Sequence, residues 1–120
     1  ERWPLGRGFD RYYGFLDAET DQYSPEVVRD NTHVTAPGTY ETGYHLTEDL
    51  IDNAIRMLAE HEAGAPDMPW LCWVALGACH APHQAPVNSS MTTRRVVWAE
   101  AIATKSRQVN RNKVLNDFMR

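Results

Sequence analysis

The sequence lacks a hydrophobic run long enough to cross a membrane. A transmembrane helix needs roughly 20 consecutive apolar residues, whereas the clearest apolar run here covers only residues 70–76 and the mean hydropathy is −0.53. Residues 1–6 also lack the apolar core of a secretory signal peptide, and no methionine opens the chain. We therefore expect no membrane partner and take residue 1 for a cut end. Cytoplasmic and periplasmic locations both stay open.

Cysteine is scarce, and repeats and low-complexity segments are absent. The two cysteines, Cys72 and Cys79, are too few for a disulfide framework, so we expect free thiols. What remains is ordinary globular composition, with 42% hydrophobic and 23% charged residues in a chain of 120. That length suits one modest domain.

Basic residues are scarce in the first 90 residues, and acidic residues are scarce in the last 30. Residues 1–90 hold 5 basic and 14 acidic residues, a net of −9, whereas residues 91–120 hold 7 basic and 2 acidic residues, a net of +5. This change of sign marks a boundary in composition. We expect residues 88–120 to form a basic, helical tail, with an apolar patch at Val96, Val97, Ala101 and Ile102.

The clearest predicted element is a helix over residues 47–61. Thr47 suits its N-cap, and acidic residues suit the positive end of the helix dipole. Gly64 and Pro66 follow and end the helix. Five residues form one apolar stripe at helical spacing: Leu50, Ile51, Ala54, Ile55 and Leu58. An acidic cluster lies at the helix start: Glu48, Asp49 and Asp52. Stabilisation by the helix dipole and solvation explain this cluster better than a catalytic role does.

Strands are predicted on both sides of this helix. A short strand is expected near residues 13–16, and two more between residues 20 and 40 around a turn at Asp30–Asn31. Residues 70–76 are continuously apolar, which is typical of a parallel strand covered on both faces, with Trp70 and Trp73 in the core. Helix followed by buried strand predicts an α/β fold with an incomplete parallel sheet, whose other strands belong to missing sequence.

The loop at residues 77–86 is the strongest site candidate. It follows the predicted buried strand, and ligands of open α/β sheets bind beyond the carboxyl ends of the strands. His80 there can donate a hydrogen bond to an anionic oxygen, and His83 is a possible second contact. Position alone leaves open that both are ordinary surface histidines. A zinc site of Cys79, His80 and His83 is a weaker reading, because its fourth ligand must come from His33, His45 or Cys72.

Three segments resemble the bacterial-type arylsulfatases of the sulfatase family. Residues 3–15, WPLGRGFDRYYGF, are similar to the family segment GFDRFYGF. Residues 44–55, YHLTEDLIDNAI, resemble the helix pattern Y…TDxLTDxAI, and residues 69–86 resemble a buried strand followed by an APH…QAP loop. Order and spacing agree over residues 2–87, which we identify as a fragment of the catalytic domain, with residues 88–120 outside the family pattern.

The resemblance implies an alkaline-phosphatase-like α/β fold that hydrolyses small-molecule sulfate esters. It implies a formylglycine nucleophile made from a C/S-x-P-x-R motif, a Ca²⁺ ion, and basic residues and histidines that hold the sulfate. Alignment to the loop pattern makes His80 one of these sulfate contacts, while His83 falls where the family needs no histidine.

This chain departs from the family in its chemistry. No C/S-x-P-x-R motif occurs, and the calcium-binding aspartates and the family's Lys-x-His segment are also absent. We therefore predict that the chain alone hydrolyses nothing. The alternative is a non-catalytic module whose basic tail binds nucleic acid or an acidic partner through Arg94, Arg95, Lys105, Arg107, Arg111 and Lys113. No base-reading motif accompanies the tail, so a solvated helix face explains it better.

Overall fold

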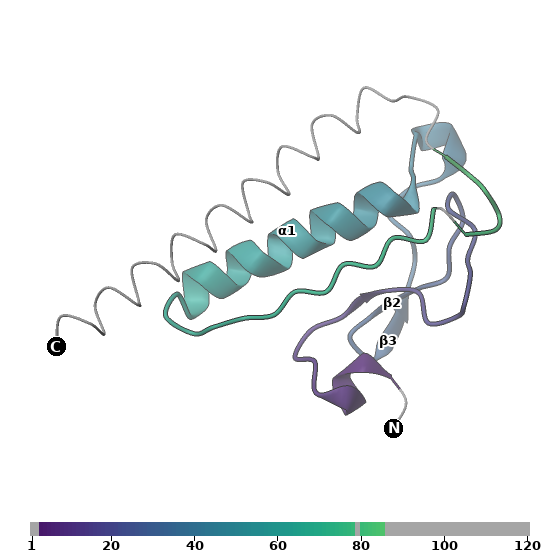
Figure 1. Cartoon of the computed structure of the whole chain (residues 1–120). Coiled ribbons are helices and arrows are strands. Elements are labelled where there is room, and N and C mark those ends of the chain that lie inside the picture. Colours follow the sequence, from purple (N-terminus) through teal and green to yellow (C-terminus); the bar gives the residue numbers. More distant parts are fainter. Residues whose placement is uncertain (1–2, 79, 86–120) are drawn as a thin grey trace, which may run out of the picture. The chain divides into compact units, whose positions relative to one another are not determined.

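The computed structural model describes residues 3–78 and 80–85, which belong to a compact unit ending at Pro86. Cys79 and the whole predicted tail, with its arginines and its apolar patch, lie outside the described residues. In chain order the elements are η1 (Pro4–Arg7), β1 (Tyr13–Gly14), β2 (Val27–Arg29), β3 (Thr32–Val34), η2 (Tyr40–Thr42) and α1 (Leu46–Gly64), of which η1 and η2 are 3₁₀ helices (Figure 1). In this part of the chain, no helix is both long and apolar enough to span a bilayer.

The three strands form one antiparallel sheet in the order β1-β2-β3. Val28 pairs with Gly14 on one side and with His33 on the other. Asp30 adopts a left-handed conformation (φ 54°) at the tight turn between β2 and β3, as short polar side chains tolerate. Its carboxylate accepts the Tyr12 backbone N–H at 2.9 Å, so the turn is tied to the entry of β1. The predicted strand near residues 13–16, the two strands between residues 20 and 40 and the turn at Asp30–Asn31 are confirmed.

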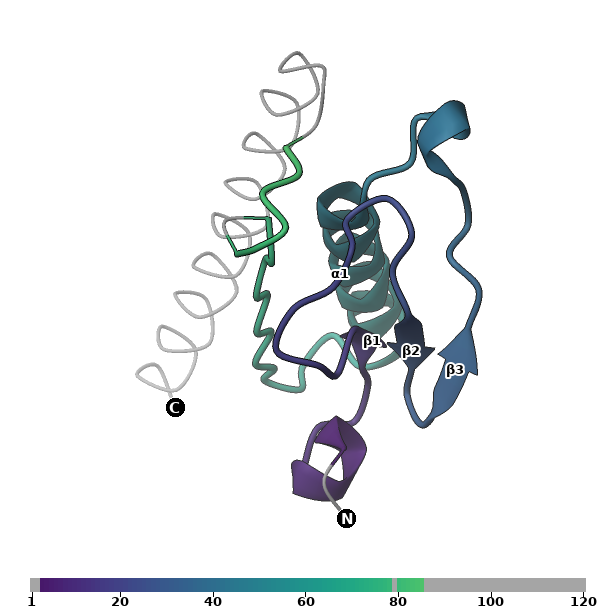
Figure 2. The same cartoon turned by 90° about the vertical axis from the view of Figure 1, so that its right-hand side faces the viewer.

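The core lies between this sheet and α1, which runs beside β1 (Figure 2). Val27, Tyr44, Leu46 and Leu50 form its buried centre. Leu46 is fully buried, and its N–H donates to the Gln22 carbonyl at 2.7 Å. The rest of the predicted helical stripe is only half-buried in the described part of the chain. The core is therefore small and centred on the first turns of α1.

Helix α1 confirms the predicted helix, but the prediction of Thr47 as its N-cap is wrong. The helix begins one residue earlier, at Leu46, and His45 is the N-cap. The His45 ring accepts the Thr47 backbone N–H through Nδ1 at 3.2 Å. Burial of the Leu46 side chain in the core explains the shift, because the helix that packs on this core begins with that residue. At the other end the helix continues past the predicted residue 61 and ends at Gly64, with Ala65 as the C-cap and Pro66 directly after it.

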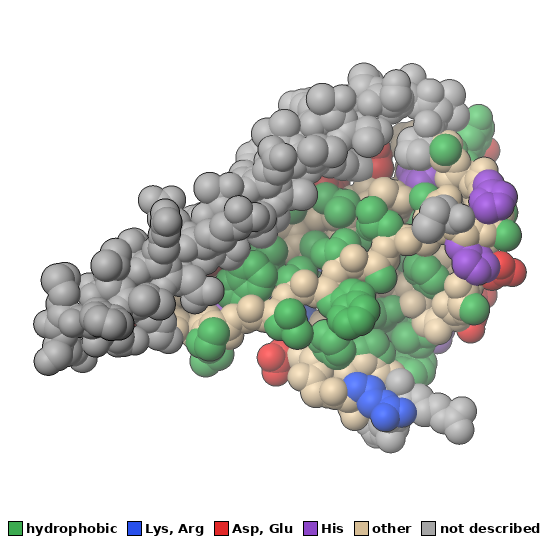
Figure 3. Space-filling model, in the orientation of Figure 1, with side chains coloured by type: hydrophobic (Ala, Val, Ile, Leu, Met, Phe, Trp, Pro, Cys, Tyr) green, Lys and Arg blue, Asp and Glu red, His purple; other side chains and the backbone are tan. Residues whose placement is uncertain are grey.

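The predicted parallel strand over residues 70–76 is wrong. These residues run extended without strand pairing, and the sheet in the described part of the chain is antiparallel. Trp70 and Trp73 are not in the core, since they are 37% and 76% exposed, and Leu71 is 80% exposed. Figure 3 shows such apolar side chains on the surface. A strand needs a neighbour for its backbone donors and acceptors, and no described segment supplies one.

Candidate functional site

His80 lies in a loop that follows the extended segment. Its side chain is 58% exposed, and its Nδ1 lies 3.2 Å from the Glu19 carboxylate and 3.1 Å from the Ala81 carbonyl. Both neighbours are acceptors, so Nδ1 carries a proton between them. No described residue hydrogen-bonds Nε2, which is therefore the ring nitrogen available to a ligand.

The loop at residues 80–85 is held mainly through Gln84. The Gln84 side-chain oxygen accepts the Gln22 backbone N–H at 2.7 Å, and its amide nitrogen donates to the Asp21 carboxylate at 2.8 Å. That second hydrogen bond is the main reason why the pKa of Asp21 is lowered. Beside it, the Tyr23 hydroxyl donates to the Ala85 carbonyl at 2.8 Å. The loop thus rests on residues 19–23, a contact that spacing along the sequence does not indicate.

His45 connects this loop to helix α1. Because Nδ1 accepts the Thr47 N–H, the proton of the neutral ring has to be on Nε2, which donates to the Gln84 carbonyl at 2.9 Å. The ring is buried and meets the Tyr23 ring edge-on, with centroids 5.1 Å apart. Both ring nitrogens are used, so His45 is not available to a metal. Sequence reasoning missed this role, although a histidine directly before a helix start is a readable signal.

His83 is not brought into this arrangement. Its side chain is exposed, and it makes no hydrogen bond or ion pair to a described residue. The two predicted histidines therefore differ: His80 has a held ring, whereas His83 has no structural constraint in this part of the chain.

The described residues do not bring the proposed zinc ligands together. Over residues 3–78 and 80–85 no three His, Cys, Asp or Glu side chains come together. His33 stacks edge-on against Trp3, with ring centroids 5.6 Å apart, and Cys72 is a half-buried free thiol whose pKa is raised by burial. Cys79, the remaining proposed zinc ligand, lies outside the described residues.

A polar network that the sequence did not reveal surrounds Asp49. Its carboxylate accepts hydrogen bonds from the hydroxyls of Tyr13 and Tyr44, at 2.5 and 2.9 Å, and from the Asn53 side chain at 2.8 Å. Arg29 lies over the Tyr13 ring and donates to Asn53 at 2.7 Å. Asp49 is thus more than a solvated dipole partner, because it ties β1 to α1. Every contact stays within the fold, which makes the network structural.

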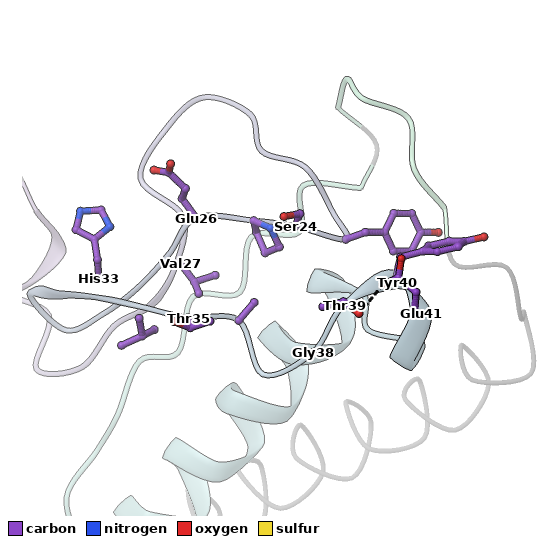
Figure 4. A pocket seen from close by; sticks show the side chains of 13 residues that line it. Ser24, Glu26, Val27, His33, Thr35, Gly38, Thr39, Tyr40 and Glu41 are labelled. Carbon is purple, nitrogen blue, oxygen red and sulfur yellow. Dashed lines mark hydrogen bonds between the residues drawn. The ribbon is translucent and has the colours of Figure 1, made fainter.

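A groove of about 720 Å³ lies along β3 and η2 (Figure 4). Its polar side chains do not converge: His33 stands at one end, and Tyr40 and Glu41 stand at the other. Ligand pockets usually place a few polar groups toward one point. The groove therefore offers no constellation for chemistry.

The comparisons with known proteins agree on one family. The Sulfatase family model matches residues 3–115, a range that continues past the predicted boundary at residue 87. The chain is 33% identical over 88 residues to "Uncharacterized sulfatase YdeN" of Escherichia coli (strain K12), and 32% identical over 91 residues to "Arylsulfatase J" of Mus musculus. These matches cover 72% and 69% of this chain.

The matched regions are 14% and 15% of those two relatives, so the chain corresponds to a small part of their length. No solved structure matches the chain significantly. The family model nevertheless covers well over half of the residues, and the two relatives agree with it. The chain belongs to the sulfatase family.

Proposed function

We propose that this chain is a segment of a sulfuric ester hydrolase of the arylsulfatase type, and that it does not hydrolyse sulfate esters by itself. The family match over residues 3–115 is the observation that carries the reaction class. The mouse relative's name supports an aryl sulfate as the small-molecule substrate of the intact enzyme. The missing C/S-x-P-x-R motif supports the lack of independent activity, because that motif supplies the family's nucleophile.

His80 is the residue that we propose to contact the sulfate group in the intact enzyme. A sulfate ester carries negative charge that increases on its oxygens as the ester bond breaks, and a fixed N–H donor stabilises such charge. The Glu19 carboxylate and the Ala81 carbonyl both lie at Nδ1, so Nε2 is the ring nitrogen that would face the sulfate, and in the doubly protonated ring its N–H would donate to a sulfate oxygen. His83 is a second candidate of lower rank because nothing in the described chain holds its ring.

Two observations support this role for His80: the loop matches the family pattern at this position, and the Nδ1 contacts hold the ring. Placement at the end of a strand does not support it. The extended segment before the loop has no strand partner in the described chain. The His80 side chain is 58% exposed, so its ring is accessible to water. A sulfate ion bound by one exposed imidazole is held weakly, since water competes for the same hydrogen bond.

The absence of independent activity is tested with the purified chain and p-nitrophenyl sulfate. We expect no release of p-nitrophenol above the buffer blank, because no residue of the chain can supply the formylglycine nucleophile. Turnover that follows the chain through a further purification step would overturn this proposal.

The role of His80 is tested by titrating the full chain with sodium sulfate at low ionic strength. The His80 ring signals in NMR spectra should move with sulfate concentration, with His83→Ala as the matched control. Equal responses of His80 to sulfate and to the same ionic strength of sodium chloride would contradict the assignment. Upstream genomic sequence that encodes a C/S-x-P-x-R motif would identify the parent enzyme.

A further inference from the structure

We propose that Gln84 is the positioning residue that fixes the loop at residues 80–85, and with it His80, on the segment formed by residues 19–23. The inference rests on the proposed sulfate contact of His80 for its functional meaning. It rests on the hydrogen bonds of the described chain for its geometry.

The first observation is that every polar group of Gln84 has a partner. Its side-chain oxygen accepts from the Gln22 N–H, and its side-chain nitrogen donates to the Asp21 carboxylate. Its backbone N–H donates to the Pro82 carbonyl at 2.8 Å, and its backbone carbonyl accepts from His45. One side-chain partner is a donor and the other is an acceptor, so the amide has one orientation that satisfies both.

The second observation is that the receiving segment is itself fixed. The other Asp21 oxygen accepts the backbone N–H groups of Tyr23 and Ser24, at 2.8 and 2.7 Å. Gln22 is 1% exposed, and its carbonyl accepts the Leu46 N–H at the start of α1. Gln84 is therefore attached to a segment that the core holds in place.

The third observation is that both ends of the loop meet this one segment in the same order. Glu19 faces His80 at 3.2 Å, Asp21 and Gln22 face Gln84, and Tyr23 reaches Ala85. The His80 backbone N–H also donates to the Gly77 carbonyl at 2.9 Å. Gln84 is the residue with the most contacts in this set, so its loss should release the loop around His80.

The test exploits the polarity of the Gln84 amide in the full chain. Gln84→Glu keeps the shape but sets a carboxylate against the Asp21 carboxylate, which is repulsive. Hydrogen exchange of the Gln22 backbone N–H should become at least about tenfold faster. The reason is that the hydrogen bond from Gln84 to the charged Asp21 carboxylate is replaced by repulsion, which releases the loop. The His80 ring signals should shift toward those of an unrestrained histidine.

A second substitution supplies the rescue. In the Asp21→Asn, Gln84→Glu double variant the amide nitrogen introduced at position 21 donates to the new carboxylate, while the amide oxygen there still accepts from Tyr23 and Ser24. Slow exchange of the Gln22 amide and the original His80 signals should return. A general loss of packing at this site would not be repaired by reversing the polarity of one hydrogen bond. Far-UV circular dichroism should show α1 intact in all variants.

The proposal is overturned if Gln84→Glu and Gln84→Ala leave the His80 signals and the exchange of Gln22 unchanged. It is also overturned if the double variant fails to restore them while α1 stays folded. Failure of the proposed function looks different: sulfate does not move the His80 signals of the unchanged chain, although the loop responds to the Gln84 series as expected.

Discussion

His45 shows how much one side chain can do in a chain this short. The same buried ring caps α1 through Nδ1 and holds the Gln84 carbonyl through Nε2. Helix starts leave backbone N–H groups without partners, and a cap satisfies one of them. Here the cap also joins the helix to the loop that carries His80.

The two functions of His45 can be separated by substitution. His45→Ala removes both hydrogen bonds and should lower the free energy of unfolding by about 1–2 kcal/mol. His45→Asn keeps a good N-cap but is too short to reach Gln84, so it should retain most of that stability. Urea unfolding followed by circular dichroism checks this. Equal losses in both variants would mean that capping contributes little.

The tyrosines around Asp49 make stability depend on alkaline pH. Burial, and then the hydrogen bond to Asp49, raise the pKa of Tyr13 and of Tyr44 above the ordinary value of 10.0. Below pH 10 each hydroxyl is protonated in both the folded and the unfolded state, so the full stabilisation that corresponds to its raised pKa is present. Above pH 10 the unfolded chain loses these protons first, so the fold loses stability as pH rises.

We expect the free energy of unfolding to fall between about pH 10 and 11, and to fall less steeply in Tyr44→Phe. The substitution removes one of the two titrating hydroxyls but keeps the ring. Urea unfolding at a series of pH values measures the slope. A slope in Tyr44→Phe equal to that of the unchanged chain would contradict the role of this hydroxyl.

At the scale of elements, helix α1 depends on the few core residues at its start. Leu50→Ala removes a side chain that is 8% exposed and should cost about 2–5 kcal/mol. With so small a core, this loss should unfold the chain. The exposed Ala59 is the matched control, since Ala59→Ser should change stability by less than about 0.5 kcal/mol. Retention of helical circular dichroism by Leu50→Ala would show that α1 does not depend on this core.

The extended segment over residues 70–76 is the element that the described chain leaves without a partner. Leu71 and Trp73 are 80% and 76% exposed, and exposed apolar groups on an unpaired segment favour self-association. The Leu71→Lys, Trp73→Lys double variant should therefore associate less at equal concentration. Sedimentation velocity measures this, with Asp67→Lys as a charge control outside the apolar run. Unchanged association would place the contact elsewhere.

At the scale of the whole molecule, much of the fold could be predicted from the sequence. The strand positions, the turn at Asp30 and the extent of α1 follow from local signals: β-preferring residues, a turn-forming Asp-Asn pair, and helical periodicity closed by glycine and proline. The family followed from three short segments in the right order. The division at residue 87 and the nucleic-acid alternative remain predictions, because the basic tail lies outside the described residues.

Much of the candidate site could not be predicted in this way. The loop pattern predicts His80 as a site residue, and this role stays a prediction. The contact of His80 with Glu19 and the contact of Gln84 with Asp21 join residues far apart along the chain. No local pattern specifies such pairs. The same reason explains the wrong prediction for residues 70–76, where an apolar run predicts burial but cannot supply the neighbour that burial needs.

By itself, the sequence determined where the chain turns, where it is helical and to which family it belongs, since these depend on residue type and spacing. Only the tertiary structure decided that the sheet is antiparallel, that His45 rather than Thr47 caps α1, and that Gln84 ties the His80 loop to residues 19–23. Those outcomes depend on which backbone groups find partners across long stretches of chain. Burial and hydrogen-bond pairing settle them together, and neither is a local property.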